Sequence, residues 1–238
     1  MKNITIRITI LIYFLFLSLP VFAQQGKDGA LTVTTLGTVV NRYSHVTANI
    51  PSAATTIPVS NIADLNRDGI AYLPTSFVTN DAVYANNALS AGDAIIVYQA
   101  QGAIINTTNT IAYGDVINYN NTGQYEIAKV ASVAGNVITV TCGLKFAYTA
   151  AHYIQVIRIP QYTTLTINTG ASIVPVPWGN AAFGGADESA NERRRGGWLG
   201  AFTTTITNNG VISANSSGFR GGTPTFNGGA SNLGLNFD

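Results

Sequence analysis

Cysteine and charge are both scarce in this 238-residue sequence. Cys142 is the only cysteine, which excludes a disulfide within the chain. Charged residues make up only 10% of the chain, and their near balance of sign gives no support for a nucleic-acid partner, which needs a clustered basic face. A chain of this size without disulfides must be held together by a buried core. Because Cys142 follows Ile138 and Val140 at a spacing of two, we predict that its thiol is buried on the same strand face.

Long helical periodicity is also missing, and period-two alternation recurs in its place. Short runs of β-branched and aromatic residues are separated by turn residues, the pattern of an all-β protein. The pair Gly135-Asn136 between two such runs predicts a two-residue hairpin. The strands that we expect are 31–34, 94–98, 125–133, 137–144 and 153–159.

The first 23 residues have the three zones of a secretory signal peptide. Lys2 and Arg7 give a positive start, an apolar run follows from Ile8 to Leu19, and Val21-Phe22-Ala23 offers small residues at a cleavage site. The run is too short for a spanning helix, which needs about 18 or more apolar residues. We therefore expect cleavage before Gln24 and a secreted or surface-exposed mature chain without a transmembrane segment. Its ten basic and eleven acidic residues leave a net charge of −1.

A different organisation begins near Gln161. The segment from Ile167 to Ile173 is echoed by the segment from Ile206 to Ile212, and both isoleucine pairs are offset by 39 residues. Each copy reads as a short strand, a Gly/Asn corner and a second short strand, as in one coil of a solenoid. The sequence thus predicts three parts: a signal peptide (1–23), a β-rich module (24–160) and the start of a parallel β-helix with a Gly/Asn-rich tail (161–238). We expect Ile167 and Ile206 to stack on adjacent coils, and the chain to continue beyond Asp238.

Four stretches carry a family resemblance. The most specific is the Gly-Phe-Arg-Gly-Gly run from Gly218 to Gly222. Together they resemble the N-terminal region of large, secreted, adhesin-like β-helix surface proteins of Gram-negative bacteria, of the Bacteroidota type. The resemblance implies a β-rich module leading into a right-handed parallel β-helix, displayed outside the cell, and it carries over no catalytic residue. The stretches are 91–103, 123–126, 156–162 and 211–222.

One segment resembles half of a calcium-binding loop. Asp64, Asn66 and Asp68 offer oxygen ligands at alternate positions, and Gly69 follows where the sharp turn of such a loop needs glycine. Thr75 stands where a bidentate carboxylate should close the site. The segment therefore predicts either a weak calcium site or an Asx-rich turn, and calcium is the only cofactor that the sequence suggests.

Six of the 21 charged residues of the mature chain lie in one loop, where three acidic residues are followed by Arg193, Arg194 and Arg195. These arginines could bind an acidic sugar, and Trp178 and Trp198, which bracket the loop, could stack on a sugar ring. The alternatives are a solvated loop for the charges and packing at the loop base for the aromatic rings. The acidic residues of the loop are Asp187, Glu188 and Glu192.

Two functions remain open from the sequence. The favoured one is a non-catalytic structural or adhesive segment of a larger secreted protein, with extracellular polysaccharide or surface glycans as partners. The alternative is a carbohydrate-active β-helix enzyme, a lyase or hydrolase, which would need acids and bases that converge on one face. No catalytic residue can be named. Neither histidine has metal-ligand spacing to another ligand.

Overall fold

The computed structural model describes residues 26–69, 82–178 and 195–218. The predicted signal peptide lies outside these residues. The described part is all-β, apart from the short 3₁₀ helices η1 (Ile62–Leu65) and η3 (Ala150–His152). None of its helices is long and apolar enough to cross a membrane.

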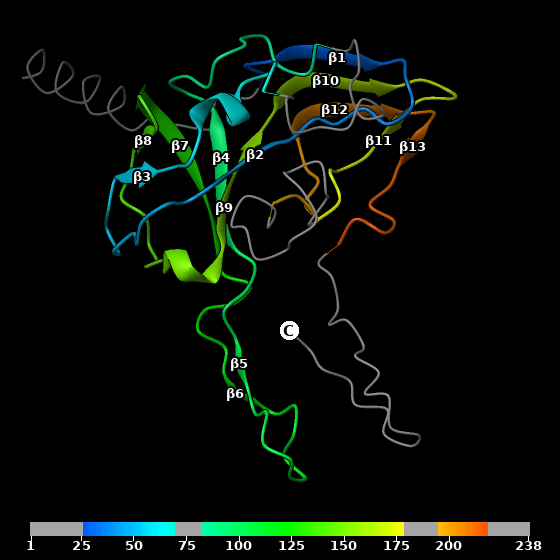
Figure 1. The fold of residues 1–238 in the computed structure, drawn as a ribbon. Coiled ribbons are helices and arrows are strands. Elements are labelled where there is room, and N and C mark those ends of the chain that lie inside the picture. The colour runs from blue at the N-terminus through cyan, green and yellow to red at the C-terminus, as the bar shows by residue number, and fades with distance from the viewer. Residues whose placement is uncertain (1–25, 70–81, 179–194, 219–238) are drawn as a thin grey trace, which may run out of the picture.

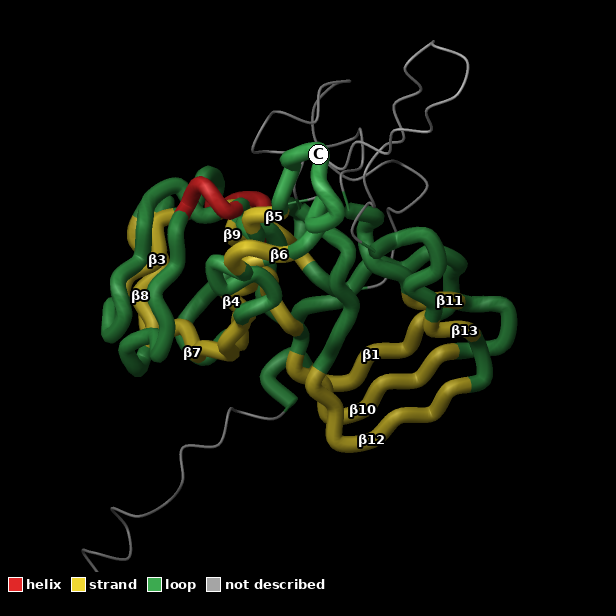
Figure 2. Tube along the Cα trace, turned by 90° about the horizontal axis from the view of Figure 1, so that it is seen from below, coloured by secondary structure: helices red, strands yellow, loops and turns green. Residues whose placement is uncertain are grey.

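An antiparallel sheet of six strands forms one half of the molecule (Figure 1). It curls along its length, so that β3 and β8 stand apart from β9 and β4 (Figure 2). In spatial order the strands are β2 (Arg42–His45), β9 (Ile154–Ile159), β4 (Ala94–Gln99), β7 (Tyr125–Ala134), β8 (Val137–Val140) and β3 (Thr56–Pro58). A separate hairpin of β5 (Ile104–Ile105) and β6 (Val116–Asn118) projects from one end (Figure 1).

The predicted hairpin at Gly135-Asn136 is confirmed. It joins β7 to β8, which pair antiparallel, and Gly135 has a φ of +54°. The predicted burial of Cys142 is wrong, because its side chain is exposed. Strand β8 ends at Val140, and the chain then bends so that Gly143 lies against the backbone of Ala53. The alternation that would have carried Cys142 to the buried face stops two residues too early.

Parallel strands make up the other half of the molecule. Strands β1 (Gly29–Val33), β10 (Gln161–Ile167) and β12 (Phe202–Asn208) form a three-stranded parallel sheet in that order. Next to it, β11 (Ser172–Ile173) pairs parallel with β13 (Val211–Ile212), and Thr38 forms a parallel bridge to Ile173. Each layer is thus a strand, a corner and a second extended segment, stacked on the layer before it (Figure 2).

The first of these layers comes from the start of the described chain. The whole antiparallel sheet lies in sequence between β1 and β10, although these two strands are hydrogen-bonded neighbours. The expected boundary at residue 161 therefore runs between neighbouring strands of one sheet. Sequence repetition could not indicate this, because β1 has no recognisable copy of the Gly/Asn corner.

The register between the last two layers differs from the predicted 39-residue offset where β10 pairs with β12. Ile206 pairs with Leu165, and Ile167 pairs with Asn208, so the offset is 41 residues there. In the second strand Ile173 pairs with Ile212, at the predicted 39. The cause is the corner, which has four residues between β10 and β11 and two between β12 and β13. Ile167 and Ile206 keep the same face because a shift of two residues preserves the alternation, but they do not stack on each other.

The buried apolar side chains form three clusters. Ile95 and Val97 of β4 face the main core of the antiparallel sheet, whereas Ala94 and Ile96 face a second cluster on the opposite side. A third cluster fills the parallel stack, where Val83 and Tyr84 pack with Leu31 and other inward residues. Strand β4 is therefore covered on both faces, as its unbroken apolar run predicts.

Candidate functional site

A buried ionic cluster lies where the two halves meet. The Asp93 carboxylate is bonded to the Lys27 ammonium group and lies 3.1 Å from Nη2 of Arg158. Both Asp93 and Arg158 have side chains that are at most 2% exposed. The Arg158 guanidinium also stacks on the Tyr84 ring, 3.9 Å from its centroid, and donates to the carbonyl oxygen of Asn87. Each charge of the cluster thus has an opposite charge beside it, as buried ions require.

Asp28 extends this cluster to the start of β1. Its carboxylate accepts hydrogen bonds from the backbone N–H groups of Gln161, at 2.8 Å, and Ala85, at 3.2 Å. Burial raises the pKa of Asp28, an effect that these two N–H groups and Arg158 oppose. The carboxylate therefore fastens the turn before β1 to β10 and to the segment that follows residue 82, which is a structural role.

The three candidate calcium ligands each have another partner. Asp64 accepts from Nη1 of Arg195 at 2.6 Å, and Asn66 accepts from the backbone N–H of Leu89 at 3.1 Å. Asp68 lies 3.3 Å from Nε of Arg67 in an exposed ion pair. Over the ranges that the structure describes, no group of three His, Cys, Asp or Glu residues is arranged to hold a metal ion. The segment has the geometry of a polar turn, with η1 capped by the side chain of Asn61.

Three of the five candidate sugar-binding residues lie in the described part of the chain, and they differ in exposure. The Arg195 side chain is 6% exposed, and besides Asp64 it contacts the carbonyl oxygen of Tyr43 at 3.3 Å. Trp178 is buried, and its backbone N–H donates to Ser217. Trp198 lines a surface hollow. Arg193, Arg194 and the three acidic residues of the loop lie outside the described residues.

The hollow beside Trp198 lies on the face of the antiparallel sheet that carries Ala94 and Ile96, next to the second apolar cluster. Two directly opposed pairs of β4 and β7 form its floor, Ile96 with Ile127 and Tyr98 with Tyr125. Residues two apart on a strand share a face, so the pairs and Trp198 surround one volume of about 390 Å³. We call it the aromatic hollow; its described lining is Ile96, Tyr98, Gly123, Tyr125, Ile127 and Trp198.

Trp198 is held in place from beneath. The Tyr43 hydroxyl, on a fully buried ring, donates to the carbonyl oxygen of Trp198. Two residues further on, Gly200 exchanges two hydrogen bonds with the side chain of Asn41, at 2.9 and 3.0 Å. A Cβ at Gly200 would lie 2.4 Å from the Trp198 ring. Glycine at this position is therefore what allows the indole to lie against the backbone.

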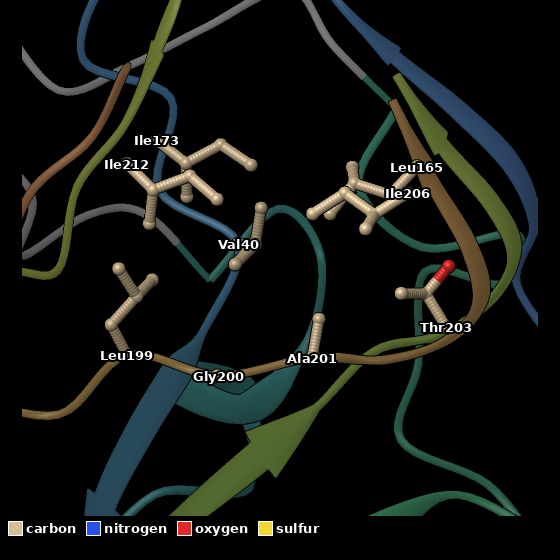
Figure 3. A pocket seen from close by; sticks show the side chains of 9 residues that line it. All are labelled: Val40, Leu165, Ile173, Leu199, Gly200, Ala201, Thr203, Ile206 and Ile212. Carbon is tan, nitrogen blue, oxygen red and sulfur yellow. The ribbon is translucent and has the colours of Figure 1, made fainter. Parts of the chain in front are cut away.

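A second hollow lies at the end of the parallel stack (Figure 3). Its volume is about 210 Å³, and Leu165 with Ile206 and Ile173 with Ile212 converge on it from the last two layers, with Val40 between them. We call it the open end. The rest of its lining is Leu199, Gly200, Ala201 and Thr203.

The two ends of the stack differ in how well their apolar side chains are covered. In the first layer Leu31 is 4% exposed and Val33 is fully buried. In the last layer Ile206 is 50% exposed and Ile212 is 45% exposed. Strand β12 is also the last in its sheet, so one of its edges has no strand partner among the described residues. Within the described residues, the open end is therefore the less covered end of the stack.

Comparisons with known proteins do not assign this chain to a family. No protein-family profile matches the chain, and no curated protein matches it. Among solved structures, it resembles the tailspike gp61 of Pseudomonas phage phi297, at 15% identity and a TM-score of 0.31 over 63% of this chain and 22% of that one.

Two other tailspikes are similar at the same level. The gp54 tailspike of Acinetobacter baumannii bacteriophage AP22, solved in complex with A. baumannii capsular saccharide, is 12% identical with a TM-score of 0.30, over 61% of this chain and 24% of that one. The tailspike protein gp49 of Pseudomonas phage LKA1 is 12% identical with a TM-score of 0.28, over 63% of this chain and 25% of that one. The chain thus spans about a quarter of each tailspike. Similarity this low carries no argument about function.

The sequence analysis named one residue of the aromatic hollow, Trp198, and missed its partners. Tyr98 had been assigned to a strand buried on both faces, and Tyr125 to the start of a hairpin. The signal that could have found them is the shared period of two, with Ile96 and Tyr98 on one strand and Tyr125 and Ile127 on the next.

Proposed function

We propose that this chain is a non-catalytic structural and adhesive segment of a secreted surface protein, in which a β-rich module leads into the first coils of a right-handed parallel β-helix. The observation that supports this most is the open end. Coils of a solenoid bury their apolar faces only against neighbouring coils. Leu31 and Val33 of the first layer are buried in one cluster with Val83 and Tyr84, whereas Ile206 and Ile212 of the last layer are 50% and 45% exposed.

The open end fits one kind of neighbour best. A further coil of the same design would offer a parallel strand to the free edge of β12 and apolar side chains to Ile206 and Ile212. Backbone pairing and burial would then be satisfied together, as between the layers already present. Such a stack gives a surface protein reach without any chemistry of its own.

Four of the six described carboxylates support a structural rather than a catalytic role. Asp28, Asp64, Asp93 and Glu126 each accept hydrogen bonds from neighbouring groups of the chain. A glycoside hydrolase needs two carboxyl groups that face a shared substrate space. The alternative function, a carbohydrate-active enzyme, would use the loop carboxylates Asp187, Glu188 and Glu192, which lie outside the described residues.

The open end should make the isolated mature chain, 24–238, self-associate. Exposed strand edges and apolar surface promote association between copies. We expect sedimentation velocity to show a mass that rises with concentration, and the double substitution Ile206→Asp with Ile212→Asp to restore a monomer. The matched control is Ile111→Asp with Ile117→Asp, which alters two exposed isoleucines near the β5–β6 hairpin and should leave association unchanged. A wild-type chain that stays monomeric at all concentrations would contradict the proposal.

A further inference from the structure

We propose that the aromatic hollow binds a neutral saccharide, with the Trp198, Tyr98 and Tyr125 rings as its contact surface. The inference deepens the adhesive part of the proposed function and rests on it for its biological meaning. The site itself does not involve the open end.

The lining combines apolar area with polar edges and no charge. Of its six described residues, three are aromatic, two are isoleucines and one is glycine. Burial raises the pKa of the Tyr98 hydroxyl, so that group is neutral at any physiological pH. A pyranose ring has the matching chemistry, because its C–H faces are apolar and its rim carries hydroxyl groups. Tyrosine and tryptophan present the same combination of an apolar body and a polar tip.

The absence of charge from this lining decides which saccharide fits. An acidic sugar would need a cationic partner for its carboxylate, and none of the described lining residues supplies one. Arg195, the nearest candidate by sequence, is already paired with Asp64. A neutral hexose polymer is therefore the class of ligand that the hollow favours. Its volume of about 390 Å³ lies within the usual range for small-ligand sites, roughly 300–1,000 Å³.

The hollow is also preformed, because it is part of the fold itself. Tyr98 and Tyr125 are directly opposed on β4 and β7, the two central strands of the sheet. Trp198 is fixed by the bonds of Tyr43 and Asn41 to its backbone segment and by its contact with Gly200. Aromatic side chains that are already ordered lose little conformational entropy on binding. Tyr119 is exposed similarly to Tyr125, at 68%, but lies outside the described lining of the hollow.

Calorimetric titration of the mature chain with cellohexaose, maltohexaose and mannohexaose tests the site. We expect at least one of these neutral oligosaccharides to bind, and Tyr125→Ala to weaken that binding about tenfold or more. Tyr125 is 60% exposed, so its truncation should leave the fold intact, which the melting temperature checks. Tyr119→Ala removes an equally exposed tyrosine outside the hollow and should bind as the wild type does.

Two results would overturn the inference. One is a folded chain that binds none of the three oligosaccharides, and the other is equal binding by the Tyr125→Ala and Tyr119→Ala variants. Binding of an oligogalacturonate in preference to the neutral probes would also contradict it, because the described lining has no charge to pair with a carboxylate. The Ile206→Asp/Ile212→Asp variant, which targets the open end, should bind saccharide normally. Failure of the stacking proposal and failure of the saccharide site can thus be told apart.

Discussion

Replacing Asp93 with alanine is expected to lower the free energy of unfolding by about 3–5 kcal/mol, the usual cost of breaking a buried ion pair from one side. The substitution leaves the Arg158 guanidinium, at 1% exposure, without its carboxylate, and Lys27 loses the same partner. It also removes the acceptor for the backbone N–H of Ser90. Because the cluster joins β1 to the antiparallel sheet, we expect both halves to be destabilised together.

Urea unfolding monitored by circular dichroism measures this effect, and the chain supplies its own control. Asp68 forms an ion pair with Arg67 in which the side chains are 62% and 34% exposed. Exposed pairs contribute at most about 1 kcal/mol, so Asp68→Ala should change stability only slightly. Equal effects of the two substitutions would mean that Asp93 does not neutralise a buried cationic pair.

Gly210→Ala is expected to destabilise the parallel stack by about 1–3 kcal/mol, the range for forcing extra atoms into a packed site. Gly210 lies in the corner between β12 and β13 and packs against the preceding layer. A Cβ there would lie 2.5 Å from the carbonyl oxygen of Ala171 and 2.6 Å from that of Asn168. Two backbone atoms cannot move aside as a flexible side chain can, so the layers must separate.

Gly218→Ala is the matched control, since a Cβ at Gly218 meets nothing within 4 Å. Thermal unfolding of the two variants compares the same chemical change with and without the close approach. Amide hydrogen exchange shows which strands are destabilised. We expect β12 and β13 to lose protection in the Gly210→Ala variant, while β4 and β9 keep theirs. A Gly210→Ala variant as stable as Gly218→Ala would show that the layers are not packed at this corner.

How far the sequence predicts this fold depends on whether the deciding contacts are local. The hairpin at Gly135-Asn136 was predictable because a two-residue turn and its flanking strands are contiguous. The burial of Cys142 was not, because the bend after Val140 follows from the packing of Gly143 on Ala53, a distant segment. The 39-residue repeat correctly paired Ile173 with Ile212, but it could not reveal that one corner is two residues shorter than the other.

In the candidate site too, the residues that local sequence could identify differ from those that long-range contacts bring together. Trp198 could be named from the sequence because it is one of only two tryptophans. Its neighbours Tyr98 and Tyr125 could not, because they come from strands whose pairing depends on the whole sheet. In the sequence, Arg195 belongs to a run of three arginines that could bind an acidic sugar. The structure instead pairs it with Asp64, more than a hundred residues earlier in the chain. Partners at that separation leave no mark on local spacing, so a charged residue that serves the fold looks the same as one that serves a ligand.

The central claim is that strands far apart in the sequence stack as parallel layers, in the register that pairs Leu165 with Ile206. A disulfide test is the most direct, with Cys142→Ser as the background. Thr164 and Thr205 are directly paired, so their Cα atoms should lie about 4.8 Å apart, the spacing of neighbouring strands. Disulfides form across Cα separations of about 4.4–6.8 Å.

Thr164→Cys with Thr205→Cys should therefore oxidise to a cross-linked chain, seen as a mobility shift on non-reducing gels and located by peptide mass spectrometry. Thr166→Cys with Thr205→Cys keeps the uniform 39-residue offset of the repeat, which places the two Cα atoms roughly 8 Å apart in this fold and should not cross-link. Cross-linking of the second pair in place of the first would contradict the register, and cross-linking of neither would contradict the parallel stack itself.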